Sequence, residues 1–208
     1  MWMAFSIVLG LYTAVRAGRF ADRFLTILAL VGISMPVFWI GALMNYYLGY
    51  KAGIFPNGGY VEFGDDPFGW FSHLILPWTA LAILFIGFYS RVLRSNVLDT
   101  INEDYVRTAR AKGLGERQIL IRHVLRNSMI PIITLWGLDF GAVIGGGAIL
   151  TETVFDLQWV GQYTADAIGQ LDVPPVLATT LFAAFFIVLL NAIVDIVYAY
   201  LDPRIRLQ

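Results

Sequence analysis

Five long apolar stretches constrain the fold of this 208-residue chain more than any other feature. They span about residues 2–15, 24–48, 71–93, 129–150 and 175–201. A helix needs about 20 mostly apolar residues to cross a membrane, so four stretches are long enough and the first is short. Pro36 and Pro77 do not argue against spanning, because neighbouring helices can satisfy the carbonyl that a proline leaves free. We therefore expect an all-α polytopic membrane protein with five spanning helices in this chain.

The composition excludes several other classes of protein. Hydrophobic residues make up 58% of the chain, which is far from the composition of an ordinary soluble enzyme. A formal net charge of −1 gives no basic field that would attract nucleic acid, so no nucleic-acid partner is expected. The absence of cysteine excludes thiol redox chemistry and thiolate metal sites.

The distribution of basic residues predicts the orientation in the membrane. Thirteen of the fourteen Lys and Arg residues fall in three segments, namely Arg16, Arg19 and Arg23, then Arg91, Arg94, Arg107, Arg110, Lys112, Arg117, Arg122 and Arg126, and finally Arg204 and Arg206. Short loops rich in Lys and Arg stay cytoplasmic, so the loop at about 95–128 and the C-terminus are expected inside, and the loops at about 49–70 and 151–174 outside. In this topology the end of the chain at Met1 faces outside, directly before the first apolar stretch. We expect a further spanning helix upstream of it. His73 and His123 lie on opposite sides in this topology, so no shared metal site is expected.

The basic loop at 95–128 carries apolar residues at helical spacing. Thr100 and Glu103 fit a capping box that opens a short helix, and Gly113 can stop that helix in the left-handed conformation. Glu116 then opens a second helix. Attraction to anionic lipid headgroups would explain the charge alone. It does not explain the glycine break or the small Ala109 and Ala111, which leave room for another protein, so we favour a docking element.

Polar residues within the apolar stretches form a second candidate site. Asp139 and Asp195 need a partner or water there, since an intramembrane carboxylate is costly. Gly137, Gly141 and Gly145 recur every four residues and predict a close-packing stripe. Asp139 then faces away from the stripe, toward the translocation path, a subunit seam or a structural hydrogen bond. Asp195 is interpreted as structural.

Aromatic residues are frequent near the predicted membrane interfaces. Trp and Tyr anchor spanning helices at the headgroup level. We interpret most of them as such anchors rather than as a ligand cage: Trp2, Tyr46, Tyr47, Tyr50, Tyr60, Trp70, Trp78, Trp136 and Trp159.

The loop contains a recognisable run of residues: Glu103, Asp104, Tyr105, Val106, Arg107, Thr108, Ala109, Arg110, Ala111, Lys112, Gly113 and Leu114. This run resembles the loop of the permease subunits of bacterial ATP-binding-cassette importers, specifically the dipeptide, oligopeptide and nickel branch. Three other segments are similar to the family: Ser34 to Trp39, Glu152 to Phe155, and Leu201 to Arg206. The chain departs from the family pattern at Asp156 to Val160, where a Gly-Trp-Pro-Gly-Leu segment is frequent.

The resemblance implies a six-helix permease, of which this chain carries five helices and a coupling-helix loop. It implies that residues Glu103 to Leu114 other than Val106 contact an ATPase, that a second homologous permease completes the path, and that two ATP-binding-cassette subunits hydrolyse ATP with Mg. An external binding protein would deliver a peptide, and the location would be the bacterial inner membrane. The chain itself contains no G-x-x-x-x-G-K-[S/T] motif, so no ATP site, bound cofactor or catalysis of its own is expected.

Two other functions fit parts of the sequence. An ion-gradient-driven secondary transporter could use Asp139 or Asp195 as a proton carrier. A membrane anchor without a path would fit the low density of intramembrane charge, but not the glycine stripe beside a carboxylate.

Overall fold

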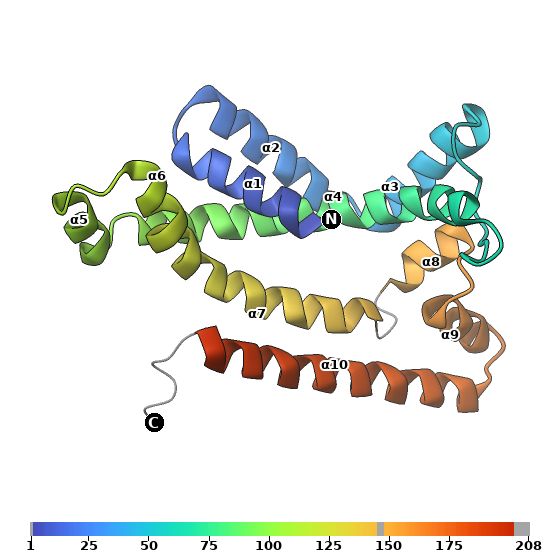
Figure 1. Ribbon diagram of the computed structural model, residues 1–208. Coiled ribbons are helices and arrows are strands. Elements are labelled where there is room, and N and C mark those ends of the chain that lie inside the picture. The colour runs from blue at the N-terminus through green and yellow to red at the C-terminus, as the bar shows by residue number, and fades with distance from the viewer. Residues whose placement is uncertain (1, 145–147, 202–208) are drawn as a thin grey trace. The chain divides into compact units, whose positions relative to one another are not determined.

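The computed structural model describes residues 2–144 and 148–201, and the described residues form helices and loops without strands. The helices are α1 (Trp2–Val15), α2 (Phe20–Ser34), α3 (Val37–Met44), the π-helical η1 (Asn45–Lys51), α4 (Pro67–Thr100), α5 (Asp104–Ala111), α6 (Glu116–Ile119), the π-helical η2 (Leu120–Leu125), α7 (Arg126–Ala142), α8 (Ile149–Phe155), α9 (Val160–Gly169) and α10 (Val173–Leu201) (Figure 1). The expected all-α fold is confirmed.

The chain divides into two compact units. The first contains residues 1–34, 83–136 and 194–208, and the second contains residues 35–82 and 137–193. Each unit has its own apolar core, and each is described separately below.

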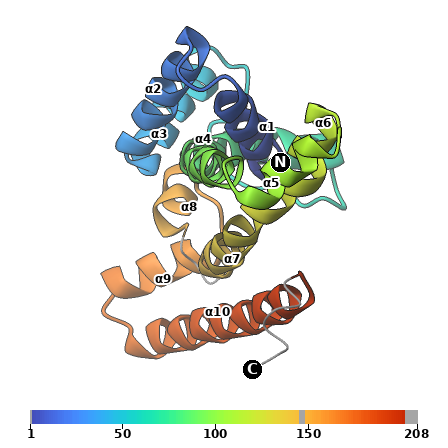
Figure 2. The same ribbon diagram turned by 90° about the vertical axis from the view of Figure 1, so that its left-hand side faces the viewer.

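The core of the first unit draws on α1, α4, the loop helices and α7. Its buried members are Ala14, Tyr89, Leu93, Val97, Val106, Ala109, Ile119, Val124 and Ile132. Helices α1 and α2 lie beside α4 in both ribbon views (Figures 1 and 2). A Cβ on Gly10 of α1 would stand 2.7 Å from the Ser90 carbonyl, and one on Gly87 of α4 would stand 2.8 Å from the Ala29 carbonyl. Glycine therefore lets these helices approach backbone to backbone.

The second unit is organised around Phe155 at the end of α8. Its ring is buried with Leu76 and Ala80 of α4, and half-buried apolar side chains of α3 and η1 pack against them. Gly41 of α3 accommodates the Phe155 ring, since a Cβ there would lie 3.0 Å from it. This core fixes α8 against α3 and α4.

The described helices support fewer spans than the five expected. Helices α4 and α10 are long and apolar enough to cross a membrane, and α2 with α3 and η1 forms a third candidate that is bent by 94°. Pro36 interrupts the helix within the 24–48 stretch, between α2 and α3, so this stretch is a bent candidate span rather than one straight helix. Proline lacks an amide hydrogen and disfavours helical geometry in the residue before it. Pro77, by contrast, lies inside α4. Helices α1 and α7 have 14 and 17 residues, so the number of spans stays a prediction.

Candidate functional site

Helices α5 and α6 form the helix-turn-helix that the loop sequence predicted. Helix α5 ends at Ala111, Lys112 is its C-cap, and Gly113 has φ of +79°. The Gly113 amide donates to the Arg110 carbonyl at 2.9 Å, which closes the last turn. Gly115 then precedes Glu116 at the start of α6. The left-handed stop at Gly113 is confirmed.

The capping box at the start of this loop is wrong. Thr100 is the last residue of α4, and Glu103 is itself the N-cap of α5 without a side-chain capping bond. The Thr100 hydroxyl instead pairs with the Ser128 hydroxyl at 3.2 Å. Helix α4 simply continues beyond the apolar stretch, which moves the helix start downstream of Thr100.

Helix α5 presents a polar face outward and an apolar face to its own unit. Val106 is fully buried and Ala109 is 6% exposed, both in the core described above. The interpretation that Ala109 leaves room for another protein is therefore wrong, because its methyl group packs inside this chain. Ala111 is exposed and Leu114 is half-buried. The exposed predicted contact residues are Glu103, Asp104, Tyr105, Arg107, Thr108, Arg110, Ala111, Lys112 and Gly113.

A hydrogen bond and an ion pair link α5 to the helices that follow it. The Tyr105 hydroxyl accepts a hydrogen bond from Asn127 Nδ2 at 2.6 Å, and Asn127 belongs to α7. Arg110 forms an ion pair with Glu116 of α6, with Nε and Oε1 2.9 Å apart. These bonds and the shared core link α5, α6 and the start of α7.

The first unit contains a partly buried ion pair that the sequence pattern did not predict. Arg94 Nε of α4 donates to Asp22 Oδ1 at 2.7 Å, and Arg94 donates again to Oδ2 at 2.9 Å. Asp22 also accepts the Gly18 amide at 2.8 Å, so its carboxylate ties the start of α2 to α4. The two residues lie 72 positions apart, and no local pattern links them.

The glycine stripe is described only in part. Gly141 of α7 faces α10 of the same unit, where a Cβ would lie 3.3 Å from the Ile187 Cα, so its predicted close-packing role is supported. Gly137 is buried and Asp139 is half-buried. Gly145 and the Asp195 side chain fall outside the described residues. The path, seam and structural roles of Asp139 stay predictions.

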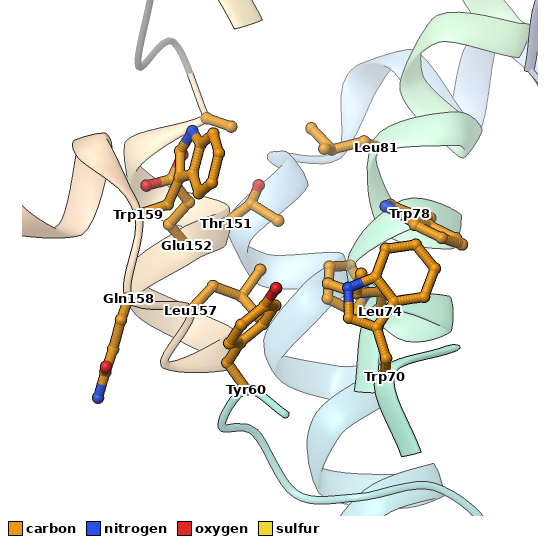
Figure 3. A pocket seen from close by; sticks show the side chains of 12 residues that line it. Tyr60, Trp70, Leu74, Trp78, Leu81, Thr151, Glu152, Leu157, Gln158 and Trp159 are labelled. Atoms are coloured by element: carbon orange, nitrogen blue, oxygen red, sulfur yellow. The ribbon is translucent and has the colours of Figure 1, made fainter. Parts of the chain in front are cut away.

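A pocket in the second unit gathers aromatic residues that are far apart in the sequence. It has a volume of about 460 Å³ and is lined by Tyr60, Trp70, Leu74, Pro77, Trp78, Leu81, Ala148, Thr151, Glu152, Leu157, Gln158 and Trp159. Figure 3 shows Trp70, Trp78 and Leu81 of α4 on one side, and Thr151, Glu152 and Trp159 on the other. The interpretation of these tryptophans as interfacial anchors did not foresee this arrangement.

Glu152 occupies an unusual position in this pocket. It is only 5% exposed, and its Oε2 accepts the Gln162 amide at 3.0 Å. Burial raises the pKa of the Glu152 carboxyl above its ordinary value, and the amides of Gln162 and Gly161 at the start of α9 partly oppose this. Because it accepts these amides, the carboxylate of Glu152 in α8 caps the N-terminus of α9.

Among the described residues no cluster of three or more His, Asp or Glu side chains could hold a metal ion.

Residues 6–207 match the family described as binding-protein-dependent transport system inner membrane component.

Curated relatives agree with this match. A putative peptide transport system permease protein of Brucella abortus is 39% identical over 96% of this chain and 63% of its own length. A probable peptide ABC transporter permease protein of Sinorhizobium fredii is 39% identical over 95% of this chain and 63% of its own. The oligopeptide transport system permease protein AppB of Bacillus subtilis is 39% identical over 97% and 64%.

The matches with these relatives thus extend over less than two thirds of their length. The family match covers almost all of the chain and agrees with its apolar helices. This chain belongs to the family of binding-protein-dependent transport system inner membrane components.

Proposed function

We propose that this chain is the membrane-spanning permease subunit of an ATP-driven importer and forms half of a translocation path for peptides. Its family and the names of its relatives support the transport role and the peptide substrate. The second half of the path would be a homologous permease, and an external binding protein would deliver the peptide. Two ATP-binding-cassette subunits would bind and hydrolyse ATP with Mg, while this chain has no catalysis of its own.

The observation that carries the proposal is the exposed polar face of α5 above a buried core. Tyr105, Arg107, Thr108, Arg110 and Lys112 are exposed, where an ATPase surface could contact them. Val106 and Ala109 beneath them share a core with α1, α4 and α7. A displacement of α5 by a neighbour is therefore transmitted to long helices rather than absorbed in a loop.

The proposed location is a bacterial inner membrane, with several spans. The basic loop containing α5 and the C-terminus would be cytoplasmic, and the loop containing α8 and α9 would be external. The asymmetric distribution of Lys and Arg in the sequence supports this orientation.

The coupling role is tested with two matched glycine substitutions. Gly113 and Gly18 both have φ of +79°, and a Cβ at either position would have no atom within 4 Å. Valine at either site should therefore impose a similar strain of about 1–2 kcal/mol. In the full-length protein assembled with its partners, we expect Gly113→Val to lower ATP-driven peptide uptake at least about tenfold, because the distortion lies in the proposed contact with the ATPase and substitutions in a coupling element change coupling by about 0.5–2 kcal/mol. Gly18→Val should retain most uptake.

Equal losses in both variants, or normal uptake in Gly113→Val, would contradict the coupling role. Size-exclusion chromatography of both complexes controls for assembly. A proton-gradient uncoupler added with ATP present separates this proposal from an ion-driven transporter, because uptake should continue.

Contact with the ATPase is tested by cross-linking. The chain has no cysteine, so Lys112→Cys introduces a single reactive site on α5. We expect it to capture an ATPase subunit, whereas Asp166→Cys on exposed α9 should not. Failure of Lys112→Cys to capture such a subunit in an active complex would overturn the proposal.

A further inference from the structure

The pocket of the second unit has the dimensions and lining of a small-molecule site. Its volume of about 460 Å³ falls within the range of about 300–1,000 Å³ that is typical of ligand pockets. Trp70 and Trp78 meet edge to face, with ring centroids 5.4 Å apart, and form one aromatic wall (Figure 3). Trp159 and Tyr60 add rings from other segments. The pocket can therefore enclose an apolar group among aromatic faces.

One polar atom in this pocket has no partner. Thr151 is 2% exposed, and its hydroxyl makes no hydrogen bond with any residue that the structure describes. In Figure 3 the Thr151 oxygen lies between the two walls. A buried hydroxyl without a partner costs free energy, so a ligand that donates a hydrogen bond to it would be stabilised.

The charge of the pocket is negative and uncompensated by side chains. Glu152 lines it, and among the described residues no Lys, Arg or His does. The backbone amides of α9 occupy Oε2, but a carboxylate has about four acceptor positions, so capacity for a further donor remains. An anionic ligand would be repelled, whereas a cation would be attracted by both the carboxylate and the aromatic faces.

We propose that this pocket binds an ammonium group carried on an apolar body, and, resting on the proposed function, that this group is the amino terminus of a peptide. Glu152 accepts a hydrogen bond from the ammonium group, Thr151 accepts another, and the tryptophans surround the first apolar side chain. The volume fits the end of a peptide rather than a long segment. A positive charge here also offsets the burial that raises the pKa of Glu152.

The competing explanation gives Glu152 a purely structural role as the cap of α9. Glu152→Gln separates the two roles, because the amide oxygen can still accept the Gln162 amide while the negative charge is lost. Glu62→Gln is the matched control, since Glu62 is exposed in a neighbouring loop and does not line the pocket.

The test is a binding titration on the purified full-length permease. The probes are leucyl-leucine amide and its N-acetylated form, which differ in the ammonium group, and the signal is tryptophan fluorescence. We expect N-acetylation and Glu152→Gln each to weaken binding at least about tenfold, as loss of a charge-assisted hydrogen bond does. Glu62→Gln should bind as the unchanged protein does. Equal binding of both probes, or full affinity in Glu152→Gln, would overturn the proposal.

Thr151→Val gives an independent readout. It removes the hydroxyl and keeps the shape, so we expect a higher thermal-unfolding midpoint without ligand together with weaker binding of leucyl-leucine amide. Unchanged binding in this variant would exclude the hydroxyl as a ligand contact.

The failure of this proposal can be told apart from failure of the proposed function. If the complex takes up peptides with ATP but neither N-acetylation nor Glu152→Gln affects binding, the pocket assignment fails alone. If the complex shows no ATP-driven uptake but the amine-dependent binding persists, the proposed function fails while the ammonium site stands.

Discussion

The helix-turn-helix elements α5–α6 and α8–α9 both end their first helix with a left-handed residue, but they differ in where their charged groups lie. Helix α5 stops at Gly113 with φ of +79°, and α8 stops at Asp156 with φ of +50°. In the α5–α6 element the charged groups Arg110 and Glu116 pair at the surface. In the α8–α9 element the carboxylate of Glu152 is buried and caps the second helix.

This difference indicates what each element can contact. Surface charges above an apolar base suit a protein partner, since they are exposed to it and their loss costs the fold little. A buried carboxylate beside a pocket suits a small ligand, because it acts where water is excluded. The two turns therefore point to a docking surface and a binding pocket, respectively.

Removing the glutamate from each turn should give the largest difference in stability between the two elements. Glu152→Ala deletes a buried acceptor of backbone amides, and we expect a loss of about 2–3 kcal/mol in unfolding free energy. Glu116→Ala deletes half of an exposed ion pair, with a side chain 73% exposed, and should cost at most about 1 kcal/mol. Chemical unfolding in mixed micelles measures both. Similar losses would show that burial does not distinguish the two turns.

Alanine in place of the glycine before or at the start of each second helix should also affect the stability of the two elements differently. A Cβ at Gly161 would lie 2.6 Å from Glu152 Oε2 and 2.8 Å from the Ile149 Cα, so Gly161→Ala must separate α8 from α9. We expect it to cost about 1–3 kcal/mol. Gly115 has no atom within 4 Å of such a Cβ, and Gly115→Ala should change stability by no more than about 0.5 kcal/mol. The same unfolding assay tests this, and a stable Gly161→Ala would contradict the tight turn.

The pH dependence of stability should show the smallest effect. Burial raises the pKa of Glu152 in the folded state, so the folded state favours the protonated carboxyl. This contribution is fully present below the unfolded pKa and is lost as pH rises through the raised folded pKa. The unchanged protein should therefore lose stability relative to Glu152→Gln over that window, with the two curves parallel outside it. A constant difference at all pH values would argue against a raised pKa.

Local sequence predicted much of the first element. The glycine stop and the second helix after Gly115 follow from residue type and spacing, and both are found in the structure. The start of α5 was misplaced because helix propensity does not reveal that α4 continues to Thr100. The inward turn of Ala109 was missed because small residues fit both a docking face and a core.

The pocket and the Asp22–Arg94 pair could not be predicted in this way. Trp70 and Trp78 belong to one helix, but Tyr60, Thr151 and Trp159 reach them only through the packing of α8. Similarly, the break at Pro36 redirects the chain by 94°, and the apolar pattern alone did not predict it.

Contiguous residues alone predict that this chain is all-helical and belongs to a family of transport-system inner membrane components, because apolar length and a local signature are properties of contiguous residues. The burial of particular polar groups, by contrast, became known only from the three-dimensional packing. Whether Glu152 and Thr151 face a pocket depends on contacts between segments that are far apart in the chain, and the environment of a charge is set by all the atoms around it.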